Sequence, residues 1–258
     1  MNRITELFKK KSGPVLSIYY TAGYPGLNDT LLIAKSLEEA GADMLEIGFP
    51  FSDPLADGPV IQHSSEVALK NGMSLRALFG QLKALREEVN IPVLLMGYLN
   101  PVIQYGMEKF CASCEECGID GLILPDLPMA EYEETYQELF RSHHLSNIFL
   151  VTPESSEERI RKIDGLSEGF VYALSSSSTT GKNMASSDRT EAYFEKLRSL
   201  ELRNPLMIGF GVSDRESFQK VVSYARGAII GSAFIRLLEK EGAGAEAIHG
   251  FVRSVLGR

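Results

Sequence analysis

The sequence predicts an α/β fold, because short apolar runs of strand length alternate along the whole chain with longer amphipathic segments. The composition is that of a globular protein, since 44% of the 258 residues are hydrophobic and 23% are charged. About eight strand-like runs occur, which is the strand number of a (β/α)8 barrel, or TIM barrel. We therefore expect residues 1–258 to form a single TIM-barrel domain with parallel strands.

Eight apolar runs are the expected strands. They are Val15–Tyr20, Met44–Gly48, Val93–Gly97, Gly121–Leu124, Ile148–Val151, Phe170–Leu174, Leu206–Gly209 and Ala228–Gly231. The intervals after the second and the sixth run are longer than the others, which predicts extended βα loops there. Such loops build the active site of a TIM barrel.

Helix signals lie between the expected strands. Ile4, Leu7 and Phe8 share one helical face ahead of the first strand, which predicts an additional N-terminal helix. Residues that favour the N-cap position precede later amphipathic segments. The N-cap candidates are Asn28 and Asp29, Ser74, and Ser213 and Asp214.

Charge and apolar length disfavour two classes of partner. A formal net charge of −8 argues against a protein that binds the phosphate backbone of nucleic acid. No apolar run reaches the ~18 to 20 residues that span a membrane, and the N-terminus lacks the features of a signal peptide. We expect neither nucleic acid nor a membrane among the partners.

Three cysteines, Cys111, Cys114 and Cys117, lie in one stretch. Their spacing is similar to that of iron–sulfur ligands, but a cluster needs four ligands and the chain has no fourth cysteine. The stretch has the pattern of a helix that ends at Gly118, so buried structural thiols are the preferred interpretation. Unpaired thiols also fit a cytoplasmic protein.

Glu46 is the most unusual residue of the expected strands, because it interrupts an apolar run. If Leu45 and Ile47 face the helices, Glu46 faces the barrel interior near the carboxyl end of its strand. Burial there would raise its pKa toward neutrality and let it deliver or accept a proton. A structural ion pair is the alternative.

A second acid, Asp57, follows in the loop sequence FPFSDPLADGP, which also contains Asp53. Two acids beside one strand end suggest paired proton chemistry, and the prolines pre-organise the loop. A surface turn rich in aspartate and proline is the alternative.

The stretch LEIGFPFSDPLADGP resembles the signature of the tryptophan synthase alpha chain family, and other motifs extend the resemblance over essentially the whole chain. These motifs are Tyr20–Gly26, Gly97–Pro101, Leu124–Pro128, Gly209–Gly211 and Ile230–Ala233. The resemblance implies a lyase of tryptophan biosynthesis that cleaves indole-3-glycerol phosphate to indole and glyceraldehyde 3-phosphate. It also places Glu46 and Asp57 at the family's two catalytic carboxylates.

The chemistry of this cleavage fits the two acids. The reaction must protonate indole C3, remove a hydroxyl proton from the glycerol chain and stabilise positive charge on the indole nitrogen. Glu46 suits the proton transfers, and an ionised Asp57 suits the indole N–H. No expected strand carries a lysine for a Schiff base, and the histidines lack metal-ligand spacing, so we expect no cofactor or metal on this chain.

The resemblance further implies a partner beta chain that carries pyridoxal phosphate, in an α2β2 assembly. Phe51, Pro54 and Leu55 are apolar residues of the loop after the second strand, and they would suit a partner surface. The residues expected to border that surface are Pro50, Asp53, Asn100 and Pro128.

Substrate contacts are expected after the last three strands. TIM barrels bind phosphate through backbone N–H groups after the seventh and eighth strands, although tight packing also explains a glycine there. The candidates at these two places are Gly209, Gly211, Gly231 and Ser232. The segment LSSSSTTGKNMASSDR after the sixth strand has the composition of a lid or phosphate loop, or of a flexible serine linker. By resemblance, its Thr180 contacts Asp57 and its Gly181 lies at the phosphate, while many relatives have glycine at Ser178 and some have arginine at Ser176.

Aromatic side chains could enclose the flat indole ring, although core packing is the alternative for each. The candidates are Tyr19, Tyr98, Tyr172 and Phe210. Tyr19 occupies a position where the family commonly has phenylalanine.

Two other functions fit parts of the sequence: an isomerase or epimerase of sugar phosphates, and a catalytically weak subunit that docks on a beta chain and activates it.

Overall fold

The strands form a single parallel sheet. A computed structural model describes residues 2–174, 187–209 and 211–258 of the chain. Within these residues the strand order is β5-β4-β3-β2-β1-β9-β8-β7-β6. The strands are β1 (Val15–Thr21), β2 (Met44–Gly48), β3 (Val93–Met96), β4 (Gly121–Ile123), β5 (Ser146–Asn147), β6 (Leu150–Val151), β7 (Val171–Leu174), β8 (Leu206–Gly209) and β9 (Gly227–Ile230).

The sheet closes through a strand that bends between β5 and β6. β5 pairs with β4, and β6 pairs with β7. Between them, the Ile148 N–H donates to the Leu122 carbonyl at 2.9 Å, and the Phe149 carbonyl accepts from the Tyr172 N–H at 3.1 Å. Residues 146–151 thus act as one strand bonded to both neighbours, and the sheet is the eight-stranded TIM barrel that the sequence predicts.

The expected strand boundaries are close to the observed ones. The second and seventh runs coincide with β2 and β8, the eighth run is shifted by one residue from β9, and the other runs differ by one or two residues at one end. Between β2 and β3 the chain forms a loop over residues 49–58 and then three helices, which accounts for the long interval there. These helices are α3 (Pro59–Lys70), α4 (Leu75–Leu82) and α5 (Leu85–Glu88). The long interval after β7 includes residues 175–186, which lie outside the described residues.

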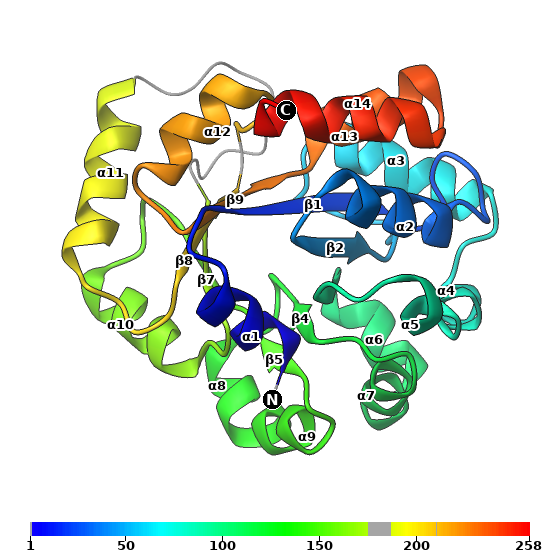
Figure 1. The fold of residues 1–258 in the computed structure, drawn as a ribbon. Helices are drawn as coiled ribbons and strands as arrows, with labels where there is room; N and C mark the ends of the chain where they lie inside the picture. The colour runs from blue at the N-terminus through cyan, green and yellow to red at the C-terminus, as the bar shows by residue number, and fades with distance from the viewer. Residues whose placement is uncertain (1, 175–186, 210) are drawn as a thin grey trace.

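Helices surround the ring of strands (Figure 1). They are α1 (Arg3–Lys10), α2 (Thr30–Ala40), α3 (Pro59–Lys70), α4 (Leu75–Leu82), α5 (Leu85–Glu88), α6 (Leu99–Tyr105), α7 (Met107–Glu116), α8 (Met129–Glu131), the π-helical η1 (Tyr132–Tyr136), α9 (Gln137–Ser142), α10 (Glu157–Leu166), α11 (Ser187–Ser199), α12 (Arg215–Val222), α13 (Ser232–Glu241) and α14 (Ala245–Leu256).

The predicted N-cap positions are confirmed in all three places, and a side-chain capping hydrogen bond is present in two of them. The Ser74 hydroxyl accepts from the Ala77 N–H at 3.2 Å, and Asp214 and Ser217 form a capping box at α12. Asp29 occupies the N-cap position of α2, but its side chain makes no capping hydrogen bond there.

Strand alternation separates two apolar layers. Met44 packs inside the barrel, whereas Leu45 and Ile47 pack in the outer layer between the strands and the helices. Helix α1 covers one end of the interior, because its Ile4 is fully buried among the inward residues of the strands. Figure 1 shows α1 across this end of the ring. Ligands must therefore enter from the opposite end, where the strands have their carboxyl ends.

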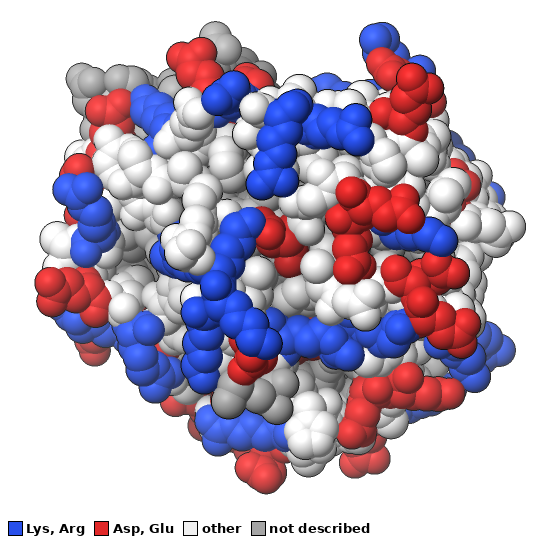
Figure 2. Space-filling model, in the orientation of Figure 1, with Lys and Arg blue, Asp and Glu red and all other residues white. Residues whose placement is uncertain are grey.

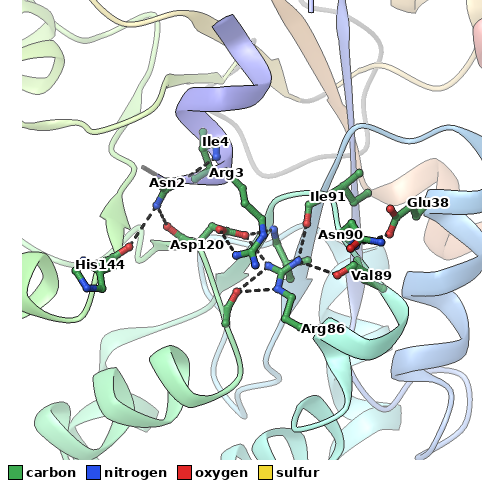
Figure 3. Close-up of polar contacts among 12 residues, drawn as sticks. Asn2, Arg3, Ile4, Glu38, Arg86, Val89, Asn90, Ile91, Asp120 and His144 are labelled. Atoms are coloured by element: carbon green, nitrogen blue, oxygen red, sulfur yellow. Dashed lines mark hydrogen bonds and ion pairs between the residues drawn. The ribbon is translucent and has the colours of Figure 1, made fainter. Parts of the chain in front are cut away.

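Asp120, just before β4, fastens α1 to the barrel (Figure 3). Its carboxylate, only 3% exposed, accepts from Arg86 at 2.6 Å, from the Val93 N–H at 2.9 Å and from Arg3 at 3.1 Å. Arg86 also donates to the Gly118 carbonyl at 2.7 Å. Because the residues come from α1, α5 and the starts of β3 and β4, this ion-pair cluster joins separate parts of the amino-terminal end.

Asp120→Asn is expected to lower the free energy of unfolding by about 3 kcal/mol, because it leaves two arginines without their buried partner. Urea denaturation at pH 7 measures the effect. Glu66→Gln is the matched control, because it removes an exposed ion pair with Lys70 and should leave the midpoint unchanged. Equal midpoints for the two variants would contradict a fastening role for Asp120.

The surface around this end carries both signs of charge. In Figure 2, Lys and Arg side chains lie next to Asp and Glu side chains over most of the visible face. No helix in the described part of the chain is both long enough and apolar enough to cross a membrane.

The cysteines are structural, as the sequence predicts. All three are buried, unpaired and located in or just after α7, and Gly118 follows with a left-handed φ of 71°. Burial raises the pKa of the Cys111 thiol to about 12 and that of Cys117 to about 11. Both therefore remain protonated thiols at neutral pH.

Candidate active site

Glu46 lies inside the barrel, as strand alternation predicts. Its side chain is fully buried, and Oε1 accepts from the Ser17 hydroxyl of β1 at 2.9 Å. Oε2 is buried with no hydrogen-bond partner among the described residues. A structural ion pair, the alternative interpretation, would occupy both oxygens with a cation, and none of the described ion pairs includes Glu46.

Burial sets the protonation state of Glu46. It raises the pKa of the carboxyl to about 8, and the hydrogen bond from Ser17 opposes this rise only in part. At neutral pH the side chain is therefore mainly a carboxylic acid. An acid with a free oxygen in the interior can give a proton to a ligand and take one back.

Asp57 lies in the loop between β2 and α3, at the carboxyl end of the barrel, and is half-buried. Burial raises the pKa of its carboxyl to about 6, and a hydrogen bond from the Tyr98 hydroxyl opposes the rise. The same hydroxyl accepts from the Ala56 N–H at 3.0 Å. Asp57 is thus mainly ionised at neutral pH, in contrast to Glu46.

Two residues outside the loop hold Asp57 in place. Tyr98 follows β3, and its ring lies against that of Phe51 with centroids 5.3 Å apart. Gln62 of α3 donates to the Asp57 carbonyl at 2.8 Å. Sequence reasoning missed Gln62, although its position one turn into the helix that follows Asp57 was a signal that could have found it.

The predicted tyrosines gather around the two acids. Burial, and after it the Glu46 carboxyl, hold the pKa of Tyr172 well above its usual value, with Tyr19 and Asp57 adding to the effect. Burial and the Asp57 carboxylate act in the same direction on the pKa of Tyr98. Both acids therefore lie close enough to Tyr19 and Tyr172 to raise the pKa values of these tyrosines, and Asp57 does the same for Tyr98. Tyr172 also packs in the interior core, so both interpretations of that residue hold.

The predicted glycines have different roles. A Cβ atom on Gly209 would lie 2.4 Å from the Tyr172 ring, so Gly209 gives space to that ring. Gly211 is exposed, with a φ of 76° that favours glycine. Gly231 is the N-cap of α13, and no side chain caps this helix, whose first residue is Ser232. In contrast, α12 carries the Asp214 capping box at its N-terminus.

Some predicted residues cannot be placed. Thr180, Gly181 and Phe210, together with the departures at Ser176 and Ser178, lie outside the described residues.

The expected partner surface is largely exposed. Asp53, Asn100 and Pro128 are exposed after β2, β3 and β4, which are neighbours in the sheet. Leu55 beside them is 83% exposed. Pro50, which directly follows the loop residue Phe49 after β2, is buried, unlike Asp53, Asn100 and Pro128.

The described strands contain no lysine. Within the same residues, no group of three or more His, Cys, Asp and Glu side chains is arranged to hold a metal ion.

Comparison with known proteins places this site in context. A model of the family "Tryptophan synthase alpha chain" matches residues 6–253. A tryptophan synthase alpha chain of Parabacteroides distasonis is 53% identical over 248 residues, which are 96% of each chain. One of Christiangramia forsetii is 54% identical over 242 residues, which are 94% of each chain.

Solved structures agree with the fold. A tryptophan synthase subunit alpha from Legionella pneumophila superposes with a TM-score of 0.88 at 33% identity, covering 99% of this chain and 97% of the other. A structure from Aquifex aeolicus gives a TM-score of 0.87 at 38% identity, covering 99% and 98%. A Mycobacterium tuberculosis tryptophan synthase gives 0.89 at 30%, covering 99% and 97%.

Proposed function

The chain belongs to the tryptophan synthase alpha chain family, and from this premise we propose that Glu46 and Asp57 perform the cleavage of indole-3-glycerol phosphate. The chain is a lyase of tryptophan biosynthesis that releases indole and glyceraldehyde 3-phosphate. The observation that carries the residue assignment is the free Oε2 of Glu46 inside a barrel whose mouth also holds an ionised Asp57.

Glu46 begins the reaction as an acid. It gives its proton to indole C3, and the resulting positive charge on the ring is shared by the indole nitrogen, whose N–H faces the Asp57 carboxylate. The bond between C3 and C1 of the glycerol chain then breaks, and its electron pair returns to the indole ring. The Glu46 carboxylate takes the C1 hydroxyl proton as the aldehyde forms. Glu46 ends protonated, so the cycle balances without another reactant.

The rest of the site supports binding. We place the substrate phosphate at the uncapped N-terminus of α13, with Gly231 and Ser232, and with Gly209, Gly211 and Gly181 nearby. Tyr19, Tyr98, Tyr172 and Phe210 would enclose the indole ring, and Thr180 would contact Asp57. This arrangement uses no cofactor on this chain.

Indole formation from indole-3-glycerol phosphate tests the function. A sugar-phosphate isomerase or epimerase would release no indole. A docking subunit of low activity would fold normally yet form no indole, either alone or with a beta chain.

The rate should depend on pH in a bell shape. Asp57 must be ionised, so kcat/KM should fall as the pH drops through about 6. Glu46 must be protonated, so kcat/KM should also fall as the pH rises through about 8. Steady-state rates between pH 5 and 9 check this. A rate that keeps rising above pH 8 would contradict an acid role for Glu46.

A beta chain is the partner of this family, and we propose an α2β2 assembly in which pyridoxal phosphate sits on the beta chain. The exposed Leu55, flanked by Asp53, Asn100 and Pro128, supports docking at the carboxyl-terminal face. The buried thiols support a cytoplasmic setting. Cross-links from the beta chain to α1, on the opposite face, would contradict this docking site.

A further inference from the structure

The Tyr19 ring spans the distance between two parts of the proposed site. Tyr19 pairs with Glu46 in the register of β1 and β2. A Cβ atom on Gly231, at the N-cap of α13, would lie 3.4 Å from the near edge of the ring. A Cβ atom on Gly48, two residues after Glu46, would lie 2.2 Å from its hydroxyl oxygen. The ring thus begins at the phosphate end and places its hydroxyl at the carboxylates.

Hydroxyl groups lie behind Tyr19. The Tyr19 hydroxyl bonds to that of Thr21, and this bond lowers the pKa of Tyr19. The Thr21 hydroxyl lies 2.7 Å from the Ser64 hydroxyl, and Ser64 donates to the Ile61 carbonyl at 2.9 Å. These contacts hold the Thr21 hydroxyl in place behind the Tyr19 ring.

A hydroxyl group can take part in more than one hydrogen bond, so the bond with Thr21 leaves the Tyr19 hydroxyl able to make another. Thr21 and Ser64 are fully buried, so water does not compete for their hydroxyl groups. Tyr19, in contrast, is half-buried. Burial, and next the Asp57 carboxylate, hold the pKa of Tyr19 well above its usual value, so the hydroxyl keeps its proton.

We propose that the Tyr19 hydroxyl makes a hydrogen bond with the C2 hydroxyl of the glycerol chain, and that Tyr19 thereby selects substrates that carry this group. The inference rests on the proposed function, which assigns two of the three donors of the substrate: the indole N–H to Asp57 and the C1 hydroxyl to Glu46. The C2 hydroxyl remains. In the substrate this hydroxyl lies between the phosphate and the reacting carbon. The Tyr19 ring likewise lies between Gly231, at the proposed phosphate site, and Gly48, near Glu46.

The test compares Tyr19→Phe with the wild type on two substrates, indole-3-glycerol phosphate and its 2-deoxy analogue, which keeps the reacting C1 hydroxyl. Tyr19→Phe should lower kcat/KM for the natural substrate about tenfold, as expected for one lost hydrogen bond. On the 2-deoxy analogue it should change kcat/KM by no more than about twofold. Equal losses on the two substrates, or no loss on either, would overturn the proposal.

Binding of indole-3-propanol phosphate, which has neither hydroxyl, provides a second readout. Its Kd should be the same for Tyr19→Phe and wild type, because indole and phosphate contacts remain. A weaker Kd would assign Tyr19 to the ring or the phosphate and overturn the proposal. If the wild type forms no indole, the proposed function fails; if it forms indole but the variant does not distinguish the substrates, only this inference fails.

Two further changes separate hydrogen bonding from stability. Tyr20→Phe removes a buried hydroxyl that donates to the Thr30 carbonyl at 2.9 Å on the outer side of the same strand. It should lower stability without altering the ratio of kcat/KM for the two substrates. Thr21→Val should reduce that ratio, because Tyr19 loses the hydroxyl group that holds its own hydroxyl in place, and Thr21→Ser should restore it. A ratio that is unchanged in Thr21→Val would contradict this role of Thr21.

Discussion

Glu46→Gln is expected to lower kcat for indole formation by about a thousandfold, because the amide has the size of the acid but can neither give nor take the proton. Interior burial gives Glu46 a pKa of about 8, so the wild type holds the required proton at neutral pH. Single-turnover measurement of indole release checks the chemical step directly. Turnover like that of the wild type would remove Glu46 from the mechanism.

Two measurements show whether the Glu46→Gln protein remains folded. It should bind indole-3-propanol phosphate as the wild type does. Its stability should also rise relative to the wild type as the pH increases. The folded-state pKa of Glu46 is raised above the ordinary value of 4.5, so the wild type loses stability as the pH rises from about 4.5 to about 8. Glutamine does not titrate, so a variant that gains nothing by pH 9 would contradict a buried Glu46.

The sequence predicts the barrel well because its signals are periodic. Alternation along β2 gives the direction of Glu46 correctly, since Leu45 and Ile47 have to face the helices. The fifth strand is expected as a continuous run, but it bends between β5 and β6 to close the ring. Closure depends on the relative positions of distant strands, which local periodicity does not contain.

The sequence identifies the two acids of the candidate site by their residue type and position, but it does not identify the side chains that contact them. Glu46 and Asp57 are identifiable because acids beside a buried strand are costly. The support from Tyr98 and Gln62 comes from other segments, so the loop sequence carries no sign of it. Pro50, expected to border the partner surface, is buried, and its place at that surface stays a prediction.

In the proposed mechanism, the different surroundings of Glu46 and Asp57 separate the pKa values of the two acids. Glu46, enclosed by apolar side chains, stays protonated, while Asp57, at the mouth and bonded to Tyr98, stays ionised. A site of two equally exposed acids would be ionised twice at neutral pH and would have no proton to give to carbon. The difference between the two pKa values therefore follows from where the acids lie: Glu46 is inside the barrel on β2, and Asp57 is in the loop after that strand.

Asp57→Asn is expected to lower kcat about a hundredfold, because asparagine keeps the size of the side chain but loses the charge that faces the indole nitrogen. The fall in rate below pH 6 should disappear in this variant, because the group that titrates there is gone. The fall above pH 8 should remain, since it belongs to Glu46. Steady-state pH profiles of the variant and the wild type measure both limbs.

Asp43→Asn is the matched control for this change. Asp43 is a half-buried aspartate just before β2, at the opposite end of the same strand, and its carboxylate accepts from the Leu16 N–H at 2.8 Å and pairs with Lys11. Its loss should cost stability but leave the pH profile intact. An acidic limb that persists in Asp57→Asn would assign the ionisation near pH 6 to another group. The negative charge that stabilises the positively charged indole ring would then have to come from a residue outside the loop after β2. The different pKa values of Glu46 and Asp57 would no longer explain the reaction.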